Sequence, residues 1–129
     1  MSTNPVHTEG NAVPPLDTDL EEKLAAIRGI HPALDLLADD LRHLLLDRLT
    51  LDTTQTAIAA LGGWEGHNLT ALIGLAVQRL SNADSNPCLR TLPLDQQKLA
   101  QLRGEATAFV LTSPTLTQFA SDTSAAITG

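Results

Sequence analysis

Leucine recurs at helical spacing over residues 32–49, and this pattern limits the fold more than any other feature of the chain. The apolar positions alternate steps of three and four residues: Leu34, Leu37, Leu41 and Leu44. Side chains at that spacing lie on one side of an α-helix. Pro32 suits the first helical turn, where its missing N–H costs nothing. The segment therefore predicts an amphipathic helix that packs within a bundle and presents an acidic opposite face.

The rest of the apolar composition favours helices as well. Leu and Ala dominate it, whereas the 129 residues include two Phe, one Trp and no Tyr. Leu and Ala are strong helix formers, and β-favouring aromatic residues are nearly missing. We expect an all-α fold, a compact bundle of five to six helices. The expected parts are a flexible arm at 1–16, a single helical domain at 17–121 and a frayed tail at 122–129.

Capping and breaking residues set the expected helix limits. The first helix should open at residues 17–19 and end before Gly29, and Asp52 should cap a third helix that stops at Gly62. Asn68 should cap a fourth helix, and Ser113-Pro114 should separate a fifth helix from a short sixth.

Two of these helices carry unusual apolar patterns. The fourth helix, over residues 69–80, is apolar on most of its circumference. Such a helix is either central in its domain or meets another chain. We expect it to be central. Gly104 weakens the fifth helix by about 1 kcal/mol relative to Ala. One face of this fifth helix carries Leu99, Leu102, Ala106, Phe109 and Val110.

Charge and cysteine content narrow the class of protein. The net charge is −7, and residues 1–52 carry ten acidic and four basic side chains. An acidic chain repels phosphate backbones and anionic membranes, so we disfavour nucleic acid and expect no membrane association. No apolar run reaches the length of a membrane span. The single cysteine, Cys88, and the lack of a signal peptide over residues 1–15 favour the cytoplasm.

The glycine-rich run at residues 62–68 is the first place to look for a recognition surface. It holds the only tryptophan, Trp64, followed by Glu65 and His67. Trp64 either closes one end of the bundle or anchors a partner, since tryptophan is enriched at interface hot spots. We include Trp64, Glu65 and His67 among the expected partner-binding residues.

A second polar group lies on the leucine-rich helix. Asp39, His43 and Asp47 are spaced at four-residue intervals and should share one helix face. Carboxylates and imidazole at this spacing can bind a metal. No second helix offers a complementary pair, so we expect a solvated face with local ion pairs, no bound metal and a role in partner binding.

Residues 55–80 resemble a helix-turn-helix. Ala59, Gly63 and Leu69 fall near positions where that motif places small, turn and buried residues. Gly62 departs from it, because an apolar side chain is expected there, and the turn is longer than usual. The resemblance implies a DNA-binding regulator that contacts DNA through Thr70, Gln78 and Arg79. Arg79 is the one basic residue among them, whereas DNA-binding proteins usually bring several Lys or Arg side chains to the phosphates.

The leading functional prediction is a non-enzymatic helical protein-protein interaction module: an adaptor, regulator or assembly subunit. Its expected partner is another protein or a second copy of the chain. We expect no cofactor and no catalytic residue. Besides the DNA-binding regulator, an alternative is a small ligand-binding protein or enzyme that uses His43, His67 or Cys88. A cation near a thiol lowers its pKa, but no paired base accompanies Cys88 in the sequence.

Overall fold

The computed structural model describes residues 12–127, and this range forms six α-helices without a strand. The all-α expectation is confirmed. The chain separates into two units, residues 1–49 and residues 50–129, which are described here one at a time. The single domain expected over residues 17–121 stays a prediction. Most of the expected flexible arm, residues 1–11, lies outside the described residues, as do the last two residues of the tail.

The first unit is a pair of helices, α1 (Thr18–Ala26) and α2 (Pro32–Leu46). Gly29, with φ +81°, lets the chain leave α1 in a left-handed conformation that other residues rarely adopt. The Nδ1 atom of His31 accepts a hydrogen bond from the Ala33 N–H at 3.0 Å and so caps α2. Proline follows in the first turn, as predicted, and α2 ends at Leu46, three residues before the expected limit.

The contact between α1 and α2 adjoins the leucine-rich face of α2, because Ala38 lies four residues after Leu34 and three before Leu41. The four leucines of that face are half-buried. Ala38 is 0% exposed and lies between ion pairs that Arg28 and Arg42 make across the two helices. The expected acidic face is therefore partly turned inward, because Asp39 pairs with Arg28. Leu36 and Leu45 remain exposed. A small residue permits the close approach, and polar side chains surround it.

The second unit holds the remaining helices. Their bounds are α3 (Leu51–Ile58), the π-helical η1 (Ala59–Gly63), α4 (Leu69–Leu80), the 3₁₀ turn η2 (Pro87–Thr91), α5 (Leu94–Leu111) and α6 (Pro114–Ala125). Thr50, and not Asp52, caps α3, since its Oγ1 accepts the Thr53 N–H at 3.1 Å. The predicted cap of α4 is confirmed: Asn68 Oδ1 accepts the Ala71 N–H at 2.8 Å.

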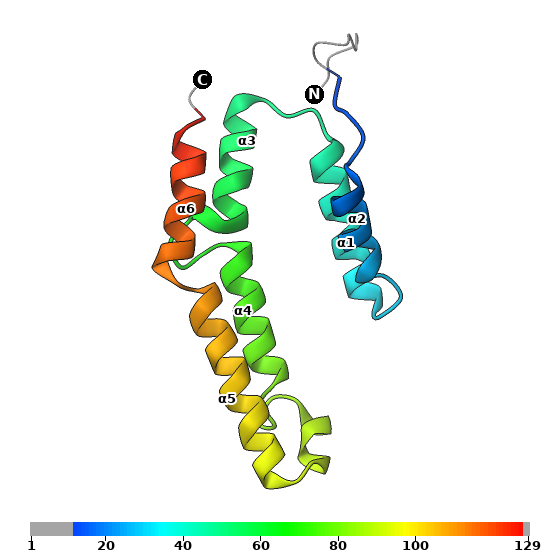
Figure 1. Cartoon of the computed structure of the whole chain (residues 1–129), viewed down its shortest axis with the longest axis vertical. Coiled ribbons are helices and arrows are strands. Elements are labelled where there is room, and N and C mark those ends of the chain that lie inside the picture. Colours follow the sequence, from blue (N-terminus) through cyan, green and yellow to red (C-terminus); the bar gives the residue numbers. More distant parts are fainter. Residues whose placement is uncertain (1–11, 128–129) are drawn as a thin grey trace. The chain divides into compact units, whose positions relative to one another are not determined.

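The helices of this unit pair in two antiparallel sets. α4 packs along α5, whereas α3 and η1 pack along α6. Figure 1 shows α3 and α4 following one another along the same direction, with α5 and α6 returning beside them. Consequently α4 does not pair with α3, the helix before it, but with α5, the next long helix of the chain.

Small residues form the contact between α4 and α5. A Cβ atom placed on Gly104 would lie 2.6 Å from the Cβ of Ser81, and one placed on Gly74 would lie 2.9 Å from the Cβ of Leu111. The Ala108 Cα would lie 3.2 Å from a Cβ on Gly74, and Ala108 is buried. The two backbones thus come closer than larger side chains would allow, and Gly104 has a packing role in the helix that it weakens.

This mode of packing leaves the large apolar side chains outside. Among the described residues, no large side chain is fully buried, and the buried apolar positions are all alanine. The fourth helix was expected to be central, yet Leu72, Ile73, Leu75 and Leu80 are exposed on α4. That expectation is wrong for the isolated chain, since α4 buries only its small-residue face.

The end of α6 is better anchored than the sequence suggests. The helix continues through Ala125, past residue 122, where fraying was expected to begin. Ser124 Oγ donates to the Gln55 carbonyl at 2.9 Å, and Gln55 Nε2 donates to the Ser124 carbonyl at 3.0 Å. This reciprocal pair joins α3 to α6 and fixes the last turn.

Candidate functional site

The strongest candidate site is an apolar surface on α5, which we call the α5 stripe. It consists of Leu99, Leu102, Ala106, Phe109 and Val110. Its four large side chains are exposed by 52% (Leu99), 63% (Leu102), 78% (Phe109) and 57% (Val110). These residues recur at helical spacing, so they form one continuous surface along the helix. Their exposure makes the stripe the largest apolar feature of α5 that no element of its own unit covers.

The stripe faces away from α4 because of where the small residues fall. Gly104 and Ala108 are the buried residues of α5. Leu102 and Ala106 each lie two residues from Gly104, which at 3.6 residues per turn places them on the opposite side of the helix. The predicted apolar face therefore exists, and the contact with α4 is made by the other face.

Charged residues border the stripe on both edges. Lys98 and Glu105 are seven residues apart and share one edge, while Gln96 and Arg103 share the other. All four side chains are exposed. A Gln101 amide lies 3.4 Å from the Glu105 carboxylate, a long and weak contact. An apolar seam with polar edges is the arrangement found where one helix face meets another protein.

An apolar hollow lies beside the start of α4. It has a volume of about 480 Å³ and is lined in part by His67, Leu69, Leu72 and Leu75. The hollow is open to solvent, and most of its lining is aliphatic. It extends the exposed apolar surface of the second unit to the turn that holds the tryptophan.

The turn displays Trp64, Glu65 and His67, as the sequence suggests. Trp64 is 49% exposed, and its backbone N–H donates to the Ala59 carbonyl at 2.8 Å. Asn68 Nδ2 donates to the Trp64 carbonyl at 2.8 Å while its Oδ1 caps α4. Glu65 and His67 are exposed. These hydrogen bonds fix the backbone of the turn. The Trp64 side chain is about half-exposed, so it is neither fully buried at the end of the bundle nor fully in solvent.

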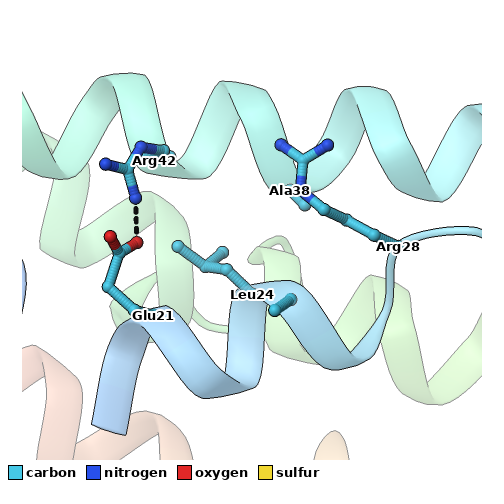
Figure 2. Close-up of a pocket in the computed structure, with 6 residues that line it drawn as sticks. Glu21, Leu24, Arg28, Ala38 and Arg42 are labelled. Carbon is cyan, nitrogen blue, oxygen red and sulfur yellow. Dashed lines mark hydrogen bonds and ion pairs between the residues drawn. The ribbon is translucent and has the colours of Figure 1, made fainter. Parts of the chain in front are cut away.

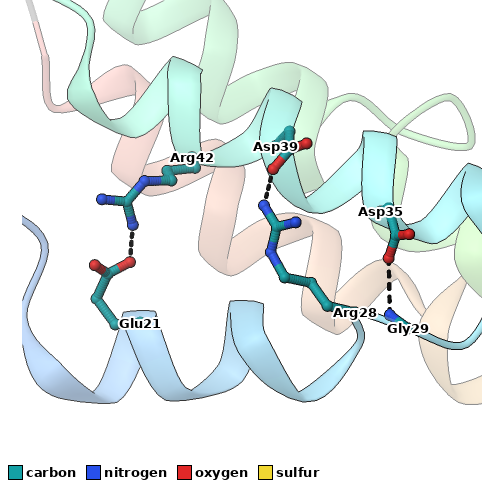
Figure 3. Close-up of polar contacts among 6 residues, drawn as sticks. All are labelled: Glu21, Arg28, Gly29, Asp35, Asp39 and Arg42. Carbon is teal, nitrogen blue, oxygen red and sulfur yellow. Dashed lines mark hydrogen bonds and ion pairs between the residues drawn. The ribbon is translucent and has the colours of Figure 1, made fainter.

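The predicted Asp39, His43 and Asp47 face is split by the structure. Asp39 pairs with Arg28 across the two helices (Figure 3), and His43 is exposed. Because α2 ends at Leu46, Asp47 lies just beyond the helix in an extended conformation. The three side chains therefore do not share one helix face. Within residues 12–127, no three His, Cys, Asp or Glu side chains gather in a metal-binding arrangement.

The contact of α1 and α2 also encloses a shallow hollow of about 410 Å³ (Figure 2). Glu21 and Arg42 form an ion pair at one end of it, with Leu24 and Ala38 beside them. Asp35 accepts a hydrogen bond from the Gly29 N–H at 2.9 Å (Figure 3). Arg28 and Arg42 are both engaged in ion pairs, and the rest of the lining includes the apolar side chains of Leu24 and Ala38.

The residues proposed for DNA reading are not displayed together. Thr70 is half-buried, and its Oγ1 donates to the Leu61 carbonyl at 2.8 Å. Gln78 is half-buried beside Gly104 in the contact with α5. Arg79 is exposed. Two of the three expected contacts therefore serve the packing of the second unit.

The residues of the ligand-binding alternative are also dispersed. His67 precedes α4, whereas Cys88 lies in η2 beyond the other end of that helix. Since α4 has 12 residues, its length separates the two by about 18 Å. Cys88 is exposed, and its Sγ donates to Asn86 Oδ1 at 3.3 Å. His43 belongs to the first unit.

The sequence predicts the apolar face of α5 but not which way it faces or that it is a candidate site. The signal that was overlooked is the glycine and alanine series of the two partner helices: Ala71, Gly74, Gly104 and Ala108. Small residues at helical spacing let two backbones approach closely, so they mark a contact face.

Comparisons with family models, with curated proteins and with solved structures found no match for this chain. Among the helices of residues 12–127, none combines the length and apolarity that crossing a membrane requires.

Proposed function

We propose that this protein is a non-enzymatic helical interaction module, an assembly subunit or regulator, that binds another protein chain through the α5 stripe. One observation carries the proposal: large apolar side chains form a continuous exposed row while small residues occupy the contact with α4. Exposed contiguous apolar surface with a polar border is typical of protein-binding sites.

The energetics support an interaction role for this surface. Phe109 and its neighbours leave apolar area in water, at a cost of about 25 cal/mol for each Å² that a partner would otherwise cover. Phe109 alone is 78% exposed, and an aromatic ring buries roughly 150–250 Å² when it is covered. The stripe is thus the part of α5 with most to gain from association.

The Trp64 turn is a second contact candidate within the same proposal. Tryptophan combines large area with few rotatable bonds, which suits an interface anchor. Glu65 and His67 beside it offer a charged group and a hydrogen-bonding ring. We assign the turn a supporting role, because its exposed apolar area is a single side chain.

A photo-crosslinking experiment tests the proposal. A benzophenone-bearing amino acid replaces Phe109 in one version of the chain and the exposed loop residue Asp84 in a matched control. Irradiation of cells that produce each version should yield covalent protein adducts at position 109 and none at position 84. The lack of a protein adduct at position 109 would contradict the proposal, whatever the identity of the partner.

A further inference from the structure

We infer that the α5 stripe binds the α5 helix of a second copy of this chain, with the two helices antiparallel. The inference rests on the proposed function, because it names the partner of that same surface. It is drawn from the spacing of the apolar residues and from the charges on the two edges of the stripe.

The apolar spacing is that of a helix-helix seam. Leu99, Leu102, Ala106 and Phe109 alternate steps of three, four and three residues. A row of this kind packs along a similar row on a second helix. In a two-fold pair, the same surface serves both copies, so each contact occurs twice. The stripe is uninterrupted from Leu99 to Val110, and Asp95 lies on the same side of α5 one turn before it.

The charges on the edges select an antiparallel arrangement centred near residues 100–101. In that arrangement, Leu99 of each copy lies opposite Leu102 of the other. On one edge, Lys98 then lies opposite Glu105 of the second copy, and this attraction occurs twice. Phe109 extends to the start of the second copy's helix, where Leu92 and Leu94 are exposed.

Other arrangements of the same stripe bring like charges together. An antiparallel pair shifted to centre on residue 104 places Glu105 opposite Glu105 and Arg103 opposite Arg103. A parallel pair places Lys98 opposite Arg103, again twice. Like charges facing one another at helix edges are destabilising. Only the first arrangement places opposite charges on an edge. In it, Asp95 of each copy lies opposite Ala106 of the other, at the two ends of the seam.

The expected dimer is small and therefore weak. The seam occupies one helix of 18 residues, which is about 27 Å long. A single helix face of this length falls in the lowest size class of specific interfaces. We expect a dissociation constant roughly in the micromolar range, so the fraction of dimer should vary with protein concentration in ordinary biochemical work.

Charge exchange tests the inference on the full chain. Sedimentation equilibrium of the unaltered protein should show its average mass rising from 13.7 kDa toward twice that value as concentration increases. Glu105→Lys places lysine opposite lysine, and Lys98→Glu places glutamate opposite glutamate. Each variant alone should dimerise about tenfold more weakly. An equimolar mixture of the two should recover dimerisation, because each chain then faces opposite charges on the other.

Asp84→Lys is the matched control for Glu105→Lys, since it makes the same change in net charge at an exposed loop position. It should dimerise like the unaltered chain. A monomer at every concentration up to several hundred micromolar would overturn the inference. Equal dimerisation of all variants, or a mixture no better than its components, would overturn the antiparallel arrangement.

The outcome separates this inference from the proposed function. Adducts at position 109 with a different protein, together with a monomeric chain, would leave the interaction module standing and remove the second copy as its partner. The lack of any adduct would remove both. Adducts of twice the chain mass, with recovery in the mixed variants, would support both.

Discussion

At the scale of single residues, glycine and alanine decide which surfaces of the second unit meet. Gly104 lies against Ser81, and Gly74 lies against Ala108 and Leu111. In a helix, glycine costs about 1 kcal/mol relative to alanine when nothing contacts it. Here the space beside each glycine is occupied by the partner helix, so the same residue that weakens α5 allows it to approach α4.

This packing predicts that Gly104→Ala destabilises the protein, whereas helix propensity alone would predict that it stabilises. Its added Cβ would lie 2.6 Å from the Ser81 Cβ and 3.3 Å from the Gln78 Cα, so the helices must separate. We expect a net loss of about 1–3 kcal/mol in the free energy of unfolding, despite the better helix propensity of alanine. Urea unfolding followed by circular dichroism measures this loss.

A double-mutant cycle assigns that effect to the contact. Ser81→Gly removes the Cβ that the new methyl group meets, so Gly104→Ala should cost less in the Ser81→Gly background. Equal losses in both backgrounds would show that the strain at position 104 arises somewhere other than against Ser81.

The ion pairs of the first unit are expected to contribute little. Glu21–Arg42 joins α1 to α2, and Arg28–Asp39 joins the turn after α1 to α2, yet all four side chains are about half-exposed. Solvent screens such pairs, and exposed pairs are typically worth 0.2–1 kcal/mol. Glu21→Gln should therefore lower stability by about that amount at low salt.

Salt dependence checks this assignment. In 1 M NaCl the Debye length falls to about 3 Å, so the unaltered chain and Glu21→Gln should unfold at nearly the same urea concentration. Ala38→Leu is the contrasting variant, because Ala38 is fully buried between the two helices. Its larger loss should persist in high salt, since overpacking is not an electrostatic effect.

At the scale of elements, the positions of the helix ends could be predicted from local sequence. Which face of a helix makes its contacts could not. Asn68, Pro32, Gly29 and Ser113-Pro114 mark ends that the structure places within a few residues of the prediction. Caps and breakers act on backbone groups within one turn, so the sequence of that turn is sufficient. The start of α3 lies two residues earlier than predicted, because Thr50 also offers a capping oxygen.

The choice of partner and face depends on residues far apart in the chain. The leucine spacing in α2 and the apolar stripe in α5 correctly indicated helices. In α2 the contact is centred on Ala38, beside the leucines, whereas α5 uses the face with Gly104, opposite its apolar stripe. The apolar face of α5 was therefore found from residue spacing, but its orientation and its standing as a candidate site were not, since orientation depends on what fits between two backbones.

One element-scale prediction concerns the link between α3 and α6. Gln55→Ala removes the amide that donates to the Ser124 carbonyl at 3.0 Å. We expect a loss of about 1 kcal/mol in unfolding free energy, because that carbonyl is left without the side-chain donor. Hydrogen exchange should also become faster at the amides of residues 122–125, which form the last turn of α6.

Gln118→Ala is the control for this link. Its side chain is exposed and reaches only Asp122 in its own helix, at 2.7 Å. Its effect should remain within about 0.5 kcal/mol. If Gln55→Ala and Gln118→Ala lowered the unfolding free energy equally, the hydrogen bonds between α3 and α6 would not contribute more to stability than an exposed contact within one helix.

At the scale of the whole molecule, the second unit combines a small-residue interior with an apolar exterior. Closely packed helices satisfy the backbone, while the area that normally drives folding stays on the outside. Monomer stability and association therefore depend on different residues of one helix: Gly104 and Ala108 on one face, Leu102 and Phe109 on the other.

This separation leads to a prediction for Phe109→Glu. Phe109 is exposed in the single chain, so at about 1 µM the unaltered protein and the variant should have the same Tm within a degree or two. At several hundred micromolar the unaltered protein should melt at a higher temperature, because association stabilises the folded state by mass action. The variant should show no such rise, since a buried carboxylate opposes the seam.

Differential scanning calorimetry over this concentration range makes the comparison. Leu51→Glu is a suitable control, because Leu51 is exposed at the start of α3 and lies outside the stripe. It should keep the concentration-dependent rise in Tm. A fall in Tm for Phe109→Glu at 1 µM would mean that Phe109 supports the fold of the single chain. The two faces of α5 would then not be energetically separate, and association could not be assigned to the stripe alone.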